Sequence, residues 1–147
     1  MKVSQKLLIS AGVTVITLGF MHFIWGYNLI KYEIFNELPQ RGKDLILLST
    51  LGLGLCLSIF GILSIYFAMK IDKRPLTTMT YALSQAIFWI IRLVFEILYP
   101  IRLRIFVMNN PASKIIIVAI ILSSLYLCSI FLIRKKIVTQ KLTQGMP

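Results

Sequence analysis

The chain has 147 residues, of which 58% are hydrophobic and only 14% are charged, and its formal net charge is +11. A soluble globule of this length would have too little polar surface to cover such a core, so lipid must surround most of the chain. The basic residues fall mainly between long apolar runs, which favours contact with anionic lipid headgroups and argues against a nucleic-acid partner. The length predicts a single integral membrane domain, residues 1–147.

The first apolar run predicts a transmembrane helix at about residues 5–28. No charge lies between Lys6 and Lys31, and the run is long enough to cross a hydrocarbon core about 30 Å thick. Its basic start is also compatible with a signal peptide. The run exceeds a typical signal core, however, and no small-x-small cleavage site follows it before bulky residues 20–27, so we expect an uncleaved helix.

The longest connection, residues 28–44, follows this helix and has room for a short interfacial helix around residues 29–35. A second charge-free run then predicts a span at residues 45–70. Neither segment carries a low-complexity tract or an internal repeat.

The third span is predicted at residues 76–99 and includes two charges, Arg92 and Glu96, because the uncharged portion before them is too short to cross. Pro75 suits a first helical turn and Pro100 stops the other end, since proline lacks the amide hydrogen that a helix interior needs.

The fourth span is predicted at residues 111–136, with Asn110 as N-cap and Pro111 as the first helical position. The pattern as a whole predicts an all-α fold, a polytopic four-transmembrane-helix bundle.

The distribution of Lys and Arg predicts the orientation. The side that holds both termini and the connection between the second and third spans carries more of them: Lys2, Lys6, Lys70, Lys73, Arg74, Arg134, Lys135, Lys136 and Lys141. The opposite side carries Lys31, Arg41, Lys43, Arg102, Arg104 and Lys114, partly offset by Glu33, Glu37 and Asp44. Because basic loops are held back during insertion, we expect a multi-pass protein of the cell membrane with both termini cytoplasmic.

One face of the third span is polar. Its members recur at steps of three and four: Tyr81, Gln85, Trp89, Arg92, Glu96 and Tyr99. We expect this face to look inward, because Arg92 and Glu96, one turn apart, reduce the cost of burial by pairing.

Small residues line the first two spans. The first carries Gly12, Gly19, His22 and Gly26 on one stripe, and the second carries Thr50, Gly54, Ser58 and Gly61. Missing side chains let helix backbones approach closely, so these stripes predict tight packing.

The ionisable groups of the first and third spans lie at one membrane depth. His22 is roughly 8 Å along the helix axis from Tyr27, and Arg92 is roughly 10 Å from Tyr99, although the two spans run in opposite directions. We therefore predict one outward-leaning cluster of His22, Arg92 and Glu96. Its candidate neighbours are Ser49, Thr50, Tyr27 and Tyr99.

Each of these groups has a structural and a functional interpretation. Arg92 and Glu96 form either an ion pair that fixes helix rotation or a site for a ligand headgroup or a proton. His22 is either a hydrogen-bonded packing residue or a proton carrier with Glu96 as its partner. Cys56 and Cys128 lie in apolar stretches and indicate packing. We expect no metal and no cofactor, since no Cys or His pair has metal-ligand spacing and one histidine cannot supply two haem ligands.

Three function hypotheses follow. The first, which leans away from an enzyme, is a bundle that binds a small amphiphile or serves as a subunit of a membrane assembly, with a lipid-like ligand, a second copy or another membrane protein as partner. The second is a membrane enzyme acting on a lipid or isoprenoid near the outer leaflet, with Glu96 or His22 as general acid or base and Arg92 holding a negative headgroup. The third is a proton-coupled small carrier, which four short helices without repeat architecture would form only as an oligomer.

Overall fold

The computed structural model describes residues 2–31, 33–100 and 111–144. Within these ranges the chain forms helices and no strand: α1 (Val3–Leu29), α2 (Glu33–Glu37), α3 (Gln40–Lys70), α4 (Pro75–Leu98) and α5 (Pro111–Gln144). All but α2 are long and apolar enough to cross a membrane. The chain is therefore an all-α, multi-pass four-helix bundle, as the sequence predicts. The expected N-cap Asn110 and two expected outer cations, Arg102 and Arg104, lie outside the described residues.

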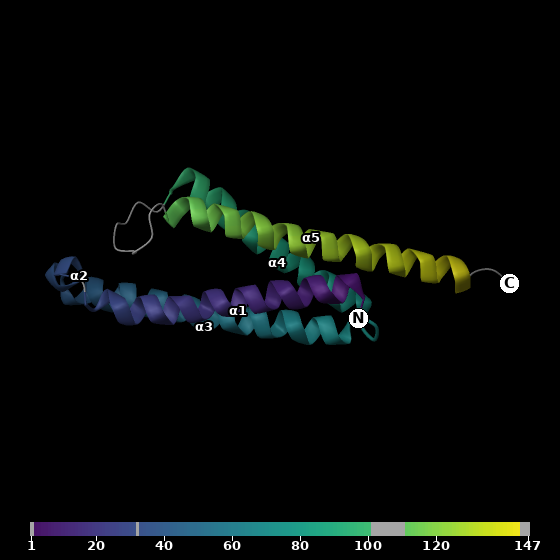
Figure 1. Cartoon of the computed structure of the whole chain (residues 1–147), viewed down its shortest axis with the longest axis horizontal. Coiled ribbons are helices and arrows are strands. Elements are labelled where there is room, and N and C mark those ends of the chain that lie inside the picture. The colour runs from purple at the N-terminus through teal and green to yellow at the C-terminus, as the bar shows by residue number, and fades with distance from the viewer. Residues whose placement is uncertain (1, 32, 101–110, 145–147) are drawn as a thin grey trace.

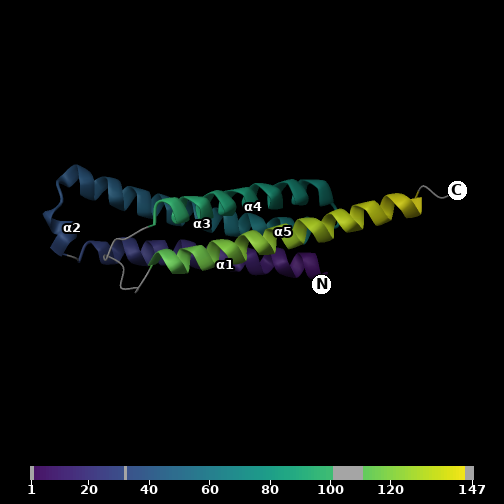
Figure 2. The same cartoon turned by 90° about the horizontal axis from the view of Figure 1, so that it is seen from above.

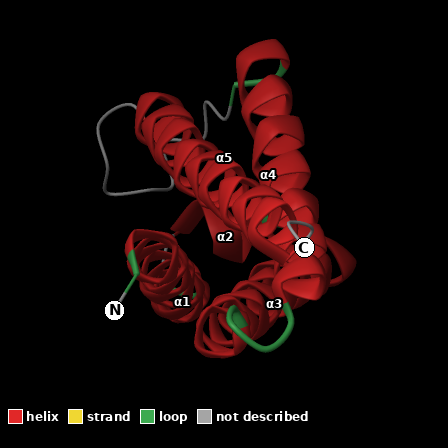
Figure 3. Ribbon diagram, turned by 90° about the vertical axis from the view of Figure 1, so that its right-hand side faces the viewer, coloured by secondary structure: helices red, strands yellow, loops and turns green. Residues whose placement is uncertain are grey.

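The four long helices form two layers (Figure 1). In one layer α1 packs along α3, and in the other α4 packs along α5, while the contacts between layers are less extensive. Seen along the bundle axis, α1 and α3 lie side by side beneath α4 and α5 (Figure 3). Two views agree that the start of α1 and the end of α5 lie at one end, here called the termini end, and that α2 lies at the other, here called the α2 end (Figures 1 and 2).

The α1–α3 contact is close because glycines face each other along it. A Cβ on Gly12 would lie 2.7 Å from the carbonyl oxygen of Gly61, and a Cβ on Gly19 would lie 2.7 Å from that of Gly54. These distances leave no room for a side chain, so the two backbones pack directly against each other. The small-residue stripes predicted for the first two spans are confirmed.

Two helices extend beyond the limits predicted from charge. α3 begins at Gln40, directly after Pro39, rather than at residue 45, and α5 continues to Gln144 rather than ending at 136. A polar side chain ends an apolar run but not a helix, because water solvates it where the helix leaves the membrane. The short helix of the long connection, α2, lies slightly later than the expected residues 29–35.

Asp72, in the turn between α3 and α4, joins three segments at the termini end. Its Oδ1 accepts a hydrogen bond from Lys2 Nζ at 2.6 Å and another from Lys136 Nζ at 2.5 Å. Lys2 precedes α1 and Lys136 lies on α5, so one carboxylate links the N-terminus, the turn and the last helix. These hydrogen bonds, that of Lys136 first, lower the pKa of Asp72 from 3.8 to about 2.

We expect acid to release this contact. Because the folded pKa of Asp72 lies below its ordinary value of 3.8, the contact contributes fully above about pH 4 and is lost as the pH falls through about 2. The free-energy effect is small, since exposed ion pairs are solvated in both states. Hydrogen–deuterium exchange, corrected for intrinsic rates, checks it: protection near Lys136 falls over this pH range in the wild type, and Asp72→Asn lowers it already at pH 5. Wild-type protection at pH 2 equal to that at pH 5 would contradict the assignment.

Candidate functional site

A cavity of about 470 Å³ lies between the two layers, in the half of the bundle nearer the α2 end. All four long helices contribute to its lining. Its volume falls within the range of small-molecule sites, about 300–1,000 Å³. The cavity is therefore large enough to hold a ligand.

The lining changes from apolar to polar along the bundle axis. Towards the middle of the bundle, one residue from each helix is apolar: Leu18, Leu57, Phe88 and Val118. A turn or more closer to the α2 end, each helix places a polar group on the lining: His22, Thr50, Arg92 and Lys114. The order is the same on all four helices although they run in alternating directions, so the cavity has one polar end.

Arg92 and Glu96 form the ion pair predicted for the third span. Arg92 Nη2 lies 2.7 Å from Glu96 Oε2, and the Glu96 side chain is fully buried whereas that of Arg92 is 32% exposed. Arg92 lines the cavity and Glu96 does not. A guanidinium carries five N–H donors, more than one carboxylate accepts, so Arg92 retains donors for a second partner.

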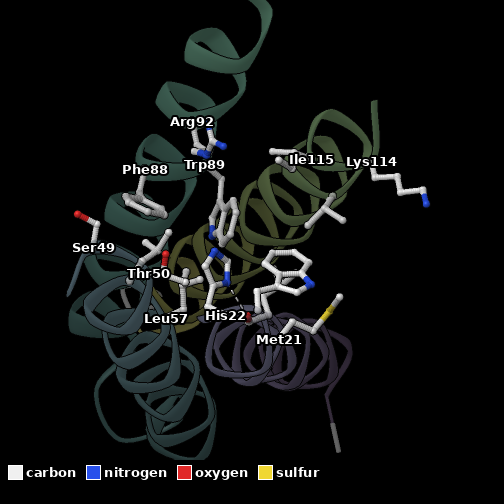
Figure 4. A pocket seen from close by; sticks show the side chains of 14 residues that line it. Met21, His22, Ser49, Thr50, Leu57, Phe88, Trp89, Arg92, Lys114 and Ile115 are labelled. Atoms are coloured by element: carbon white, nitrogen blue, oxygen red, sulfur yellow. Dashed lines mark hydrogen bonds between the residues drawn. The ribbon is translucent and has the colours of Figure 1, made fainter. Parts of the chain in front are cut away.

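His22 is oriented by a hydrogen bond within its own helix. Its Nδ1 lies 2.8 Å from the carbonyl oxygen of Leu18. A carbonyl oxygen only accepts, so Nδ1 carries a hydrogen and Nε2 is the nitrogen that gains or loses a proton. The ring also packs against Trp25 with centroids 5.0 Å apart. Figure 4 shows the imidazole of His22 and the indole of Trp89 pointing toward each other across the space between α1 and α4.

Trp89 has a buried hydrogen-bond donor without an acceptor. Its side chain is 5% exposed, and its Nε1 has no hydrogen-bond partner among the described residues. Buried indole N–H groups usually find an acceptor, so this donor marks a place where a ligand atom would be stabilised. The sequence pattern places Trp89 on the inward face but carries no signal that its N–H lacks a partner.

Thr50 and Ser49 are also part of the lining, with their hydroxyls directed elsewhere. The Thr50 hydroxyl donates to the carbonyl oxygen of Ile46 at 2.8 Å, within its own helix. Figure 4 shows the Ser49 hydroxyl and the Lys114 ammonium directed away from the cavity. Within the described ranges, Arg92 is therefore the cation whose charge lies at the polar end.

Tyr27 and Tyr99 do not line the cavity. They are 65% and 74% exposed on the surface of the bundle. Tyr99 follows the last residue of α4, and its backbone angles leave the helical region, so the periodicity of the polar face stops before it. The structure thus brings His22, Ser49, Thr50 and Arg92 to one cavity, with Glu96 behind Arg92.

A hydroxyl cluster joins three helices on the termini side of the cavity. Tyr126 Oη lies 2.6 Å from Ser64 Oγ, and Tyr81 donates to the carbonyl oxygen of Phe60 at 2.6 Å. The Oγ atom of Ser64 also lies 3.0 Å from Oη of Tyr81. The cluster links α3, α4 and α5, where sequence reasoning saw only a polar face on the third span and an apolar fourth span.

Comparison with protein-family models, with curated proteins and with solved structures finds no match to this chain. Within the described ranges, no group of three or more His, Cys, Asp or Glu side chains is placed to hold a metal ion. The interpretation of the cavity therefore rests on its own geometry and chemistry.

Proposed function

We propose that the chain binds a small amphiphile, taken up from the surrounding bilayer, in the cavity between its two helical layers, and that it does so without chemical conversion. The observation that supports this is the polarity of the lining, which is apolar near the bundle centre and carries His22 and Arg92 nearer the α2 end. An amphiphile has the same division between chain and headgroup. With both termini in the cytoplasm, as the basic residues predict, the polar end faces the outer leaflet.

Binding fits the arrangement better than catalysis does. The enzyme hypothesis requires Glu96 or His22 to exchange a proton with the substrate, which needs close contact. Glu96 lies outside the cavity lining, behind Arg92, whereas His22 lies on it. In the part of the chain that the structure describes, His22 has no carboxylate or second histidine beside it on the lining, which favours a site that holds its ligand unchanged.

The proposal can be tested by filling the cavity. Val118 lines the cavity, whereas the preceding residue, Ile117, is 55% exposed on the outside of the bundle. We expect Val118→Phe to weaken binding of a bromine-labelled single-chain amphiphile about tenfold or more, since the added ring occupies the chain's place. Ile117→Phe, which places the same aromatic ring on the lipid side, serves as the control and leaves binding unchanged.

Tryptophan fluorescence provides the measurement. The chain has two tryptophans, Trp25 and Trp89, and both line the cavity. A bromine atom quenches an indole that it touches, so saturable quenching reports occupancy of this site. Equal saturable quenching in the two phenylalanine variants would show that the probe binds elsewhere, and the proposal would fail.

A further inference from the structure

Among the described residues, the lining of the cavity carries positive charge and no negative charge. Arg92 and Lys114 belong to it, although the Lys114 ammonium is directed away from the space, and no Asp or Glu of the described ranges does. Glu96, the nearest carboxylate partner of Arg92, is fully buried outside the lining. A cationic headgroup would therefore face the Arg92 guanidinium, with the Glu96 carboxylate behind it and off the lining, whereas an anion would face a group of opposite charge.

Two hydrogen-bond donors meet at the polar end. Arg92 and Trp89 are three residues apart on α4, so their side chains leave the same face of the helix. Arg92 has N–H groups beyond those that Glu96 occupies, and the Trp89 N–H has no acceptor in the described part of the chain. Both groups donate and neither accepts, so the group that satisfies them must accept at least two hydrogen bonds.

The apolar part of the cavity has room for one chain. The hydroxyl cluster of Ser64, Tyr81 and Tyr126 lies beyond Leu57 and Val118 toward the termini end, where hydrogen bonds join α3 to α4 and α5. A volume of about 470 Å³ lies in the lower half of the range for drug-sized ligands, about 300–1,000 Å³. A volume of that size suits a compact headgroup with a single chain.

We infer that the ligand is a single-chain amphiphile with an oxyanion headgroup, a carboxylate or a phosphate monoester, which accepts hydrogen bonds from the Arg92 guanidinium and the Trp89 indole N–H. This inference rests on the proposed function and names its ligand class. The guanidinium fork matches the paired oxygens of either headgroup. The aromatic walls also suit a quaternary ammonium group through cation–π contacts, but Arg92 at the same place opposes it.

Four bromine-labelled probes with one chain length test the inference in the wild-type protein: an alkyl carboxylate, an alkyl monophosphate, a primary alcohol and a trimethylammonium salt. The protein is held in uncharged detergent, and binding is followed by quenching of Trp25 and Trp89. We expect an oxyanion to bind about tenfold more tightly than the alcohol, and the ammonium probe to bind most weakly. The tighter of the two oxyanions identifies the headgroup.

Two variants test which residues cause the preference for an oxyanion over an alcohol. In Arg92→Gln with Glu96→Gln, which removes both charges of the ion pair and leaves a neutral amide at each position, the anion-to-alcohol affinity ratio falls to about one. Trp89→Phe keeps an aromatic ring and removes the N–H, so we expect the anion-to-alcohol affinity ratio to fall several-fold. Fluorescence quenching of Trp25 then reports binding. Arg41→Gln, which removes an exposed cation on α3 outside the cavity, keeps the wild-type ratio and shows that overall charge is not the cause.

The outcomes separate the inference from the proposed function. Equal affinity for all four probes, or tightest binding of the ammonium probe, overturns the oxyanion inference and leaves amphiphile binding in place. An oxyanion preference that survives the loss of both charges at 92 and 96 also overturns it. Absence of saturable quenching with every probe removes the proposed function itself.

Discussion

Gly61→Ala destabilises the bundle by about 1–3 kcal/mol, although it adds a single methyl group. A Cβ at position 61 would lie 2.6 Å from the carbonyl oxygen of Gly12 and 2.8 Å from the backbone nitrogen of Ile16. Both atoms belong to the backbone of α1, so no side-chain rotation relieves the contact. The whole helix has to move, which opens the closest interface in the structure.

Gly52 provides the matched control on the same helix. A Cβ there meets nothing within 4 Å, because position 52 faces outward. Gly52→Ala leaves stability unchanged or raises it by up to about 1 kcal/mol, since alanine is the better helix former. Unfolding of both variants by sodium dodecyl sulfate in mixed micelles, followed by circular dichroism, gives the comparison. The same loss at both positions would contradict the close packing of α1 on α3.

The second large effect is expected at Arg92. Arg92→Gln leaves the carboxylate of Glu96, which is fully buried, without its ion-pair partner. Removing one member of a buried pair costs about 3–5 kcal/mol, and we expect the lower end of that range because Arg92 is 32% exposed. Adding Glu96→Gln removes the buried charge that Arg92 no longer pairs and restores most of the lost stability.

The same unfolding assay applied to Arg92→Gln, Glu96→Gln and their combination gives the coupling energy of the pair. We expect the double variant to be clearly more stable than Arg92→Gln alone. Additive losses in the two single variants would mean that the pair is solvated and does not hold α4 in place.

The fold could be predicted from the sequence because lipid imposes two simple requirements, length and freedom from charge. These requirements place α1 and α4 within a few residues of the observed helices. They could not place the start of α3 at Gln40 or the end of α5 at Gln144, since helices continue past the membrane where no residue stops them.

The site was only partly predictable. The period on the third span identifies the inward face that carries Trp89, Arg92 and Glu96, and all three are buried or partly buried. The position of a residue along the helix axis can be estimated from the sequence, but the direction in which its side chain points cannot. Tyr27, expected near the cluster, instead lies on the surface. The pairing of Ser64 with Tyr126 depends on the rotation of α5, which the length and charge-free run of the fourth span do not determine.

A density map of the protein in a lipid nanodisc tests the central claim most directly. We predict elongated density between the α1–α3 and α4–α5 layers, with its wider end beside Arg92 and its narrow end running toward Val118. A map in which α1, α4 and α5 close on one another at the level of His22, with their own side chains filling the space, would contradict the account.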